Sequence, residues 1–229
     1  NPDPVPEEYY AALKESPFGT LGLPEQFGGV PVDQVTMMLV QERFFRRNFP
    51  FNTPVLQIKD AQEFGSEEQL RKVTEALKTK AMAFSLGISE PGAGSDVAGI
   101  RTRAERVDGG YRLSGSKIWI SNANLAEFLV VFAKTAPDAG HRGMTAFIVP
   151  RGSQGMAIGE PLGKLGQRCA PTCEVFLDQV FVPDDHRLGE EGSGFALAMT
   201  VFDHSRPMVA AFGVGLIERC LDESLAYAT

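Results

Sequence analysis

The spacing of apolar residues changes twice along this chain, and that change limits the folds it can adopt. The pattern is helical up to residue 80, favours short strands over 81–190, and is helical again over 191–229. Apolar residues three or four apart mark one face of a helix, whereas alternation marks a strand. The pattern therefore predicts an α+β chain with a helical domain at 1–80, a β domain at 81–190 and one long helix at 191–229.

The middle region contains short runs rich in β-branched and aromatic residues. The sequence Asp108-Gly109-Gly110 separates two of them, 102–107 and 111–113, and predicts a hairpin turn. Five other predicted strands lie at 82–88, 128–132, 144–149, 175–177 and 180–182. Short strands at this spacing indicate a closed or sandwich-like β domain.

Two helices are expected before the strands. Ser66 and Gln69 form a capping box, which predicts that a helix begins there. The segment 32–46 carries apolar residues at helical spacing, namely Val35, Met38, Leu39 and Phe45.

The last segment carries an apolar stripe that one helix cannot bury alone. We expect it to need a partner that the chain does not obviously contain, and we expect Pro207 to kink the helix. The stripe consists of Leu197, Val201, Val209, Phe212, Leu216, Cys220 and Leu221.

Charge and composition exclude several classes of function. A net charge of −7 argues against a nucleic-acid partner, because phosphate binding needs a basic face. No apolar run approaches the roughly 20 residues of a membrane span. Three cysteines, an odd number, argue against a disulfide framework and favour a reducing compartment. The cysteines are also too few, without a histidine cluster, to indicate a metal site.

Three motifs carry candidate chemistry, although each alone has a commoner structural explanation. The loop Glu90–Asp96 contains two glycines that let backbone N–H groups approach a ligand, but such loops are usually tight turns. The only tryptophan, Trp119, offers a flat face for a ring, but a single tryptophan is more often a core residue. Asp203 and Arg206 share one helix face, which by spacing alone indicates a surface ion pair.

Taken together, these motifs resemble the acyl-CoA dehydrogenase family in order and spacing. The likeness runs through EPGAGSDVAGI, GSKIWISN, LGQRCAPTCEVFLDQVFVP, LGEEGSGFALAM and FDHSRPMVAA, and is nearest to the medium-chain acyl-CoA dehydrogenases. The resemblance implies an N-terminal helical domain, a middle β-barrel domain and the start of a C-terminal helical bundle. It also implies FAD bound between the last two.

The resemblance assigns ligand contacts to residues of all three motifs. Asp203 and Arg206 are expected to contact the CoA part of an acyl-CoA substrate, as is Ser95, where cofactor and thioester meet. Ser121 is expected to bring its hydroxyl near the reactive flavin nitrogen. The expected flavin contacts are Leu86, Ile88, Ser89, Gly94, Ser95, Trp119, Ile120 and Ser121.

In this family a glutamate takes the α-proton of the acyl thioester while FAD accepts the β-hydride, and a trans-2-enoyl-CoA forms. Electrons then pass to electron-transferring flavoprotein. Most members carry the glutamate on a late loop, here expected beyond Thr229, and a minority carry it immediately before the arginine that matches Arg206. Ser205 occupies that second position, so we expect the chain alone to be inactive.

Other readings fit the same resemblance. An acyl-CoA oxidase shares the first half-reaction, and a non-catalytic partner subunit of a split dehydrogenase would also lack the base. The family's first helix and most of its C-terminal domain are expected to be missing from this chain. The resemblance further implies a homo-oligomer, a dimer of dimers, in the bacterial cytoplasm or, less expectedly, the mitochondrial matrix.

Overall fold

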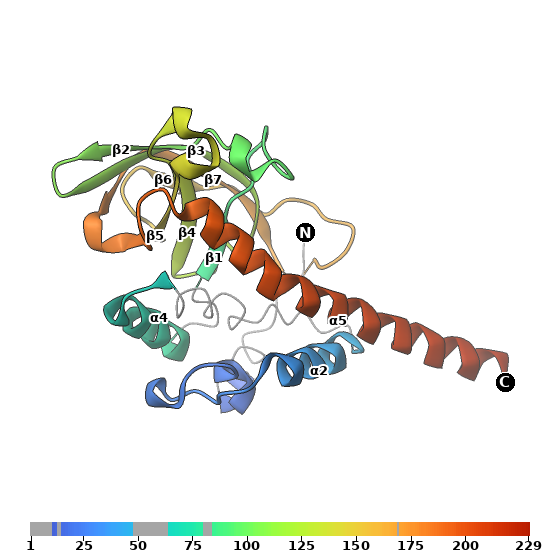
Figure 1. Cartoon of the computed structure of the whole chain (residues 1–229). Coiled ribbons are helices and arrows are strands. Elements are labelled where there is room, and N and C mark those ends of the chain that lie inside the picture. Colours follow the sequence, from blue (N-terminus) through green and yellow to red (C-terminus); the bar gives the residue numbers. More distant parts are fainter. Residues whose placement is uncertain (1–10, 13–14, 48–63, 80–83, 169) are drawn as a thin grey trace.

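The computed structural model describes residues 11–12, 15–47, 64–79, 84–168 and 170–229. Helices α2 and α4 lie on one side of a sheet, and the long helix α5 runs beneath the sheet and out past α2 (Figure 1). Among the described residues, no helix is long and apolar enough to cross a membrane. The mixed helix and sheet composition confirms the α+β prediction, while the domain boundaries at 80 and 190 stay predictions.

The described elements before the sheet are two short 3-10 helices and two α-helices. Their bounds are η1 (Pro17–Thr20), η2 (Glu25–Phe27), α2 (Gln34–Phe45) and α4 (Glu67–Thr79). Asp33 caps α2 by accepting a hydrogen bond from the Thr36 amide at 2.6 Å. Both predicted helices are therefore present.

Of the four apolar residues that predicted α2, Phe45 is buried and Met38 is partly buried, but the other two are exposed. Met37, Gln41 and Phe45 are buried, whereas Val35 and Leu39 are 65% and 56% exposed. The apolar spacing located the helix correctly but did not identify the side that packs, because a polar residue, Gln41, lies in the contact with the rest of the chain.

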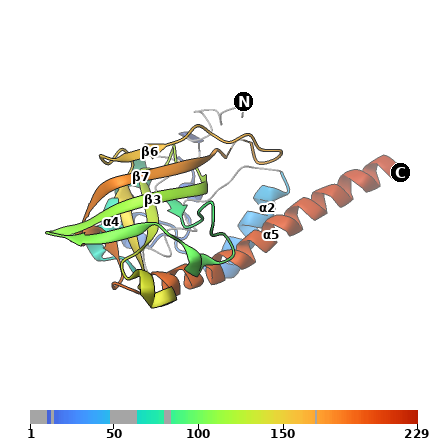
Figure 2. The same cartoon turned by 90° about the horizontal axis from the view of Figure 1, so that it is seen from above.

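The sheet has eight strands in the order β6-β7-β3-β2-β4-β5-β8, with β1 beside β4. In chain order they are β1 (Phe84–Gly87), β2 (Arg103–Val107), β3 (Gly110–Ser121), β4 (Phe128–Lys134), β5 (Met144–Pro150), β6 (Met156–Ile158), β7 (Thr172–Pro183) and β8 (Arg187–Leu188). Among the described residues, β2 and β4 pair through Arg103 and Lys134 alone. Figure 2 shows β6, β7 and β3 side by side on the face away from the helices.

The predicted barrel is wrong, because the path of strands is open. Closure would require each strand to pair with a neighbour all the way round. Instead, within the part of the chain that the structure describes, the path ends at β6, which pairs with β7 alone, and at β8, which pairs with β5 alone. The sheet folds over a shared core without joining its ends.

Alternation along the strands creates two hydrophobic cores. On β4, Leu129 and Val131 point into the core enclosed by the folded sheet, while Val130 and Phe132 point into a second core. The second core also receives residues from α4 and α5. A strand buried on both faces explains why the run at 128–132 is continuously apolar.

Two predicted turns have different outcomes. The hairpin is confirmed, since Val107 pairs with Gly110 and Gly109 has φ of 71°. The break predicted between 177 and 180 is wrong, because β7 is one strand. An extra residue of β7 bulges there, with Gln179 at φ of 52°, so the strand bends without ending.

Helix α5 (Gly194–Ala228) is continuous through Pro207 and packs against two partners. Leu197 and Val201 are buried in the core that faces the helices. Further along, Gly215 lies so close to α2 that a Cβ there would sit 2.1 Å from the Glu42 carbonyl oxygen. The Phe212 ring stacks on Phe45 with centroids 3.8 Å apart. Helix α2 is thus a partner within the chain, which corrects the expectation of none.

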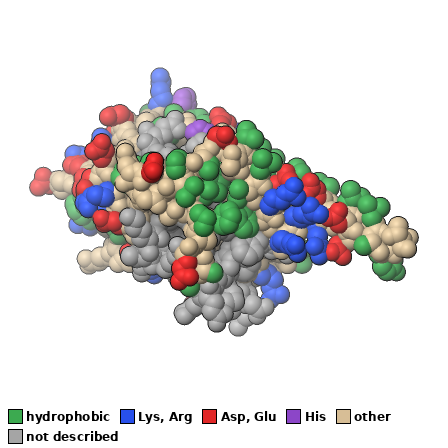
Figure 3. All heavy atoms as spheres, turned by 90° about the horizontal axis from the view of Figure 1, so that it is seen from below, with side chains coloured by type: hydrophobic (Ala, Val, Ile, Leu, Met, Phe, Trp, Pro, Cys, Tyr) green, Lys and Arg blue, Asp and Glu red, His purple; other side chains and the backbone are tan. Residues whose placement is uncertain are grey.

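Beyond this contact α5 projects from the body of the protein (Figure 1). Charged side chains gather where the projection begins (Figure 3). There Arg46 at the end of α2 lies 3.5 Å from Glu218 and also pairs with Asp222. Apolar residues on the same turns of α5, including Ile217 and Leu221, are 69% and 57% exposed.

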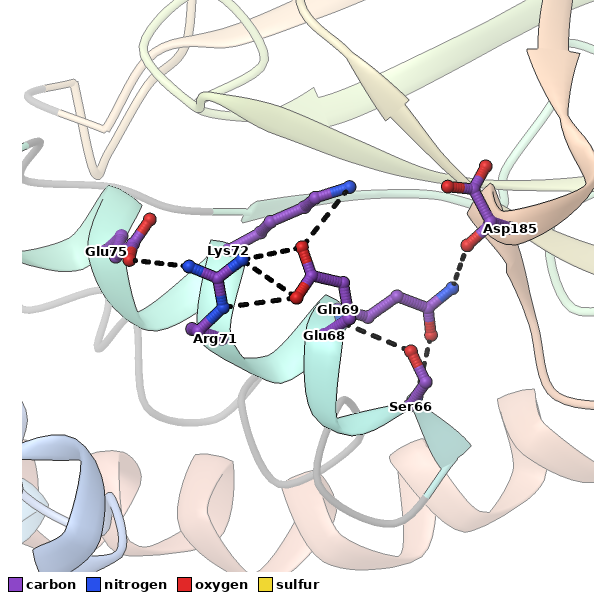
Figure 4. A network of polar contacts seen from close by, with 7 residues as sticks. All are labelled: Ser66, Glu68, Gln69, Arg71, Lys72, Glu75 and Asp185. Carbon is purple, nitrogen blue, oxygen red and sulfur yellow. Dashed lines mark hydrogen bonds and ion pairs between the residues drawn. The ribbon is translucent and has the colours of Figure 1, made fainter.

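The capping box at the start of α4 is confirmed and also joins the helix to the sheet (Figure 4). The Ser66 backbone N–H donates a hydrogen bond to the Gln69 side-chain oxygen at 2.9 Å. The Ser66 hydroxyl accepts a hydrogen bond from the Gln69 backbone N–H at 3.2 Å. The Gln69 side-chain nitrogen donates to the carbonyls of Asp185 and Arg187 at 2.7 and 3.0 Å. One side chain therefore caps α4 and fixes its distance from β8.

We predict that Gln69→Ala lowers the free energy of unfolding by about 1–3 kcal/mol, because a cap is lost and two partly buried carbonyls lose their donor. Urea unfolding measures the loss. Glu68→Gln is the control, since it disturbs only the exposed ion pairs with Arg71 and Lys72 and should cost no more than about 1 kcal/mol. Equal losses in the two variants would contradict the role given to Gln69.

Candidate functional site

The candidate site begins at an irregularity near the end of β3. The pairing of β3 with β7 slips between Lys117 and Ile120, where β3 carries one residue more than β7. Trp119 lies in this bulge with φ of 63°, and its side chain is 61% exposed. A bulky residue in the left-handed region is strained, and such strain is concentrated at functional sites.

The bulge determines which predicted residues face outward. Trp119 and Ser121 are exposed, whereas the Ile120 side chain is 1% exposed and lies in the core enclosed by the sheet. Because side chains alternate along a strand, Trp119 and Ser121 share the outer side. Ile120 therefore presents only its backbone to a ligand, while Trp119 and Ser121 offer a ring and a hydroxyl.

The loop after β1 supplies the second part of the site. Leu86 and Ser89 are half-buried, and the Ile88 side chain is buried in the core that faces the helices. Gly94 and Ser95 are exposed, and a Cβ at Gly94 would meet nothing within 4 Å. The loop thus has an anchored base and an open tip.

Two hydrogen bonds bring the loop and the bulge together. The Ile118 amide donates to the Ser89 carbonyl at 2.9 Å, and the Ser85 hydroxyl donates to the Ser121 carbonyl. Within the loop, Glu90 and Ala93 exchange backbone bonds of 2.9 and 3.1 Å. These contacts place the predicted residues of both motifs in one region.

A buried ion pair, which the sequence motifs do not predict, lies beneath this region. Lys117 Nζ is 2.7 Å from Glu90 Oε1, with side-chain exposures of 0% and 7%. The Glu90 carboxylate also accepts bonds from the amides of Arg101 and Thr102 at 2.6 and 3.0 Å, and from the Thr102 hydroxyl. The sequence signal for this pair is a lysine inside a predicted strand, two residues before Trp119. A lysine buried in a strand needs a charged or hydrogen-bonding partner.

The environment shifts the pKa values of both partners. Burial raises the pKa of Glu90, but the Lys117 charge and the hydrogen bonds from Lys117, Thr102 and Arg101 outweigh it, so the net pKa lies below its usual value. Burial lowers the pKa of Lys117 to about 8, against the opposing effect of Glu90. Both groups are therefore charged at neutral pH.

The third part of the site is on α5. Arg206 Nη1 is 2.8 Å from Asp203 Oδ1, and the two side chains are 66% and 72% exposed. The Ser205 hydroxyl donates to the Phe202 carbonyl at 3.2 Å. Asp203 and Arg206 thus form the surface ion pair that their spacing indicates, on a helix face open to a ligand.

Helix α5 also contacts the core beneath the loop. Phe202, one residue before Asp203, packs against the cluster that contains Ile88 and Ala93. The helix carrying Asp203 and Arg206 and the loop after β1 therefore contribute to one hydrophobic core.

A cavity of about 360 Å³ lies elsewhere, beside the turn that follows β3. Its lining does not include the predicted site residues. It is formed by Asn124, Arg151, Gly152, Met156, Ile158, Gly159, Glu160 and Pro161. The candidate site is formed by other residues, on the loop, the bulge and the helix.

Comparison with known proteins supports one family. The family model for the acyl-CoA dehydrogenase middle domain matches residues 85–180, and that for the acyl-CoA dehydrogenase C-terminal domain matches 192–229. Probable acyl-CoA dehydrogenase fadE25 of Mycobacterium leprae (strain TN) is 36% identical over 226 residues, covering 97% of this chain and 58% of the relative. The chain thus spans less than two thirds of this relative's length.

Solved structures agree. The glutaryl-coenzyme A dehydrogenase glutaryl-CoA complex has a TM-score of 0.88 at 36% identity, covering 96% of this chain and 58% of that one. The FAD complex of PigA has a TM-score of 0.89 at 29% identity, covering 98% and 61%. The particular likeness to medium-chain enzymes stays a prediction.

We predict that Glu90→Gln lowers the free energy of unfolding at pH 7 by about 3 kcal/mol, the low end for breaking a buried ion pair. Glu90 has a folded-state pKa below its unfolded value of about 4.3. Its contribution is therefore complete above that value and is lost as pH falls through the folded-state pKa. Urea unfolding should show the two proteins converging in stability below about pH 4.

Glu105→Gln provides the control, because it removes an exposed carboxylate from the neighbouring strand β2. Its effect should stay within about 0.5 kcal/mol at both pH values. A gap between Glu90→Gln and the unmodified protein that is independent of pH would show that the charge of Glu90 is not what stabilises the loop.

Proposed function

Because this chain belongs to the acyl-CoA dehydrogenase family, we propose that it forms the flavin-binding part of an enzyme that dehydrogenates an acyl-CoA thioester to a trans-2-enoyl-CoA. The observation that carries the proposal is the strained, outward-facing Trp119 beside the open loop of Ser89 to Ser95. Electron-transferring flavoprotein is the proposed electron acceptor, and a homo-oligomer the proposed assembly.

The chemistry of the exposed groups fits FAD. The Trp119 indole offers a flat apolar face for an isoalloxazine ring, and the exposed Ser121 hydroxyl can donate to a ring nitrogen. A Cβ at Gly92 or Gly94 would meet nothing within 4 Å, so their backbone is open to a ligand. PigA, with the same fold, is known as an FAD complex.

In the proposed reaction FAD supplies the hydride acceptor, and this chain supplies binding and orientation. Trp119 and Ser121 hold one side of the ring system, and the loop from Ser89 to Ser95 meets the thioester. Arg206 attracts the anionic CoA portion, because a guanidinium stays charged at every working pH. The shared core of α5 and the loop after β1 supports placing Arg206 near the loop.

The α-proton of a thioester is weakly acidic, so its removal needs a base within hydrogen-bond reach. Ser205, immediately before Arg206, donates its hydroxyl to the Phe202 carbonyl. It is not a carboxylate and provides no base at that position. We therefore propose that the base is a glutamate on a late loop of the family, following Thr229, and that this chain alone does not turn over.

The proposal is tested with the chain and with a protein extended to the length of its relatives, both supplied with FAD. Both proteins should keep yellow, bound flavin after free FAD is removed. Only the extended protein should reduce an artificial acceptor with a saturated acyl-CoA. Turnover with oxygen as sole acceptor would indicate an oxidase. An inactive extended protein that still binds FAD would support a non-catalytic partner subunit, and failure of both to bind FAD would refute the proposal.

We predict that Trp119→Ala weakens FAD binding by about 1–3 kcal/mol, the range found for stacking of a base on an aromatic side chain. Equilibrium dialysis with FAD measures the change. Phe181→Ala is the matched control, because Phe181 is an exposed aromatic on β7, 44% accessible and outside the candidate site. Equal weakening of FAD binding by both variants would contradict a specific contact between Trp119 and FAD.

We also predict that Arg206→Ala weakens binding of an acyl-CoA by roughly tenfold, the effect of losing about 1.4 kcal/mol. Calorimetric titration of the FAD-loaded protein measures the affinity. Arg219→Ala is the control, because Arg219 lies on the same helix, is 46% exposed and pairs with Glu223. If Arg219→Ala has the larger effect, the substrate does not lie over the part of α5 that carries Arg206.

A further inference from the structure

The buried pair of Lys117 and Glu90 connects the two parts of the site on the sheet. Lys117 lies two residues before Trp119, in the strand that carries the bulge. Its Nζ donates to the Ile88 carbonyl at 3.2 Å and contacts Glu90 Oε1 at 2.7 Å. Ile88 and Glu90 flank Ser89, so the ammonium group holds the loop from inside.

A second set of contacts holds the same loop from the other side. The Glu90 carboxylate accepts hydrogen bonds from the backbone amides of Arg101 and Thr102 and from the Thr102 hydroxyl. Thr102 directly precedes β2, which pairs with β3 through the confirmed hairpin. The carboxylate is thus fixed by donors from β3 and from the entrance to β2.

Stability alone is a poor reason for such a pair. Two buried charges lose their hydration, and this cost often equals or exceeds their attraction. A non-glycine residue in the left-handed region, by contrast, persists only when its surroundings fix it. Trp119 is such a residue, and Lys117, two residues earlier on the same strand, has a buried side chain fixed by two partners.

We propose that Lys117, acting through Glu90, is a positioning residue that holds Trp119 in its outward, left-handed conformation and keeps the Ser89–Ser95 loop beside it. The two elements then form a preorganised surface, so binding FAD does not have to order them. This inference rests on the proposed flavin site, although the position of Trp119 can be measured without FAD.

The experiment compares Lys117→Met, Glu90→Gln and the double variant in the full chain. Trp119 is the only tryptophan, so its fluorescence, acrylamide quenching and near-ultraviolet circular dichroism report the bulge directly. Lys117→Met removes the charge and leaves Glu90 unpaired, which should reduce stability. The double variant removes both charges and should regain most of that stability.

The Trp119 signals separate positioning from stability. We expect them to change in Lys117→Met and to stay changed in the double variant, because neither methionine nor glutamine restores the bond to the Ile88 carbonyl. The dissociation constant for FAD should rise roughly tenfold in both, as expected when binding must order its own contacts. Tyr111→Phe is the matched control, since it removes a buried polar contact to Glu191 at the far end of β3.

A double variant with the stability and the Trp119 signals of the unmodified protein would overturn the inference. So would a Trp119 change in Tyr111→Phe equal to that in Lys117→Met, because the signal would then follow stability alone. If the Trp119 signals change as expected but the unmodified protein binds no FAD, the proposed function fails while the positioning of Trp119 stands.

Discussion

The antiparallel pairing of β3 with β7 is the constraint on which the rest of the structure depends. Both strands are twelve residues long, and each carries one bulge. The bulge in β7 bends the pair of strands. The bulge in β3 shifts the alternation of its side chains by one residue, so that different positions face the core on either side of it. As a result Ile120 faces the core while Trp119 and Ser121 face outward, and the same backbone pairing holds both arrangements. The site is therefore built into the sheet and does not rely on a separate loop to present the tryptophan.

Helix α5 gives the second constraint, because it contacts the sheet and α2 in succession. Its first turns lie in the core that faces the helices, and Gly215 lets its backbone approach α2 closely. Between these contacts lie Asp203 and Arg206, on the part of the helix whose two ends are both held. Exposed ion pairs contribute little to stability. An ion pair on a firmly held helix is thus free to exchange its partner for a charged ligand.

Local features of this fold could be predicted from the sequence, and non-local ones could not. The capping box at Ser66 and the turn at Gly109 depend on residues a few positions apart, and both are confirmed. The bulge at Gln179 depends on the register against a distant strand, so one strand was read as two. The partners of the buried pair, Glu90 and Lys117, are 27 residues apart and meet only after the loop has folded back. Closure of the sheet, which strand spacing left open as one of two possibilities and the family resemblance favoured, failed for the same reason, since it depends on whether the two ends of the sheet meet.

The open path of the sheet has a consequence for self-association. Its described end strands, β6 and β8, have only three and two residues. An exposed strand edge of useful length is a template for adding a strand from another molecule, and edges this short present too few backbone groups. Intermolecular sheet extension is thus disfavoured at both ends, even though the strands between them are strongly apolar. At these two edges, contact between copies of this chain would therefore depend on side chains more than on backbone pairing.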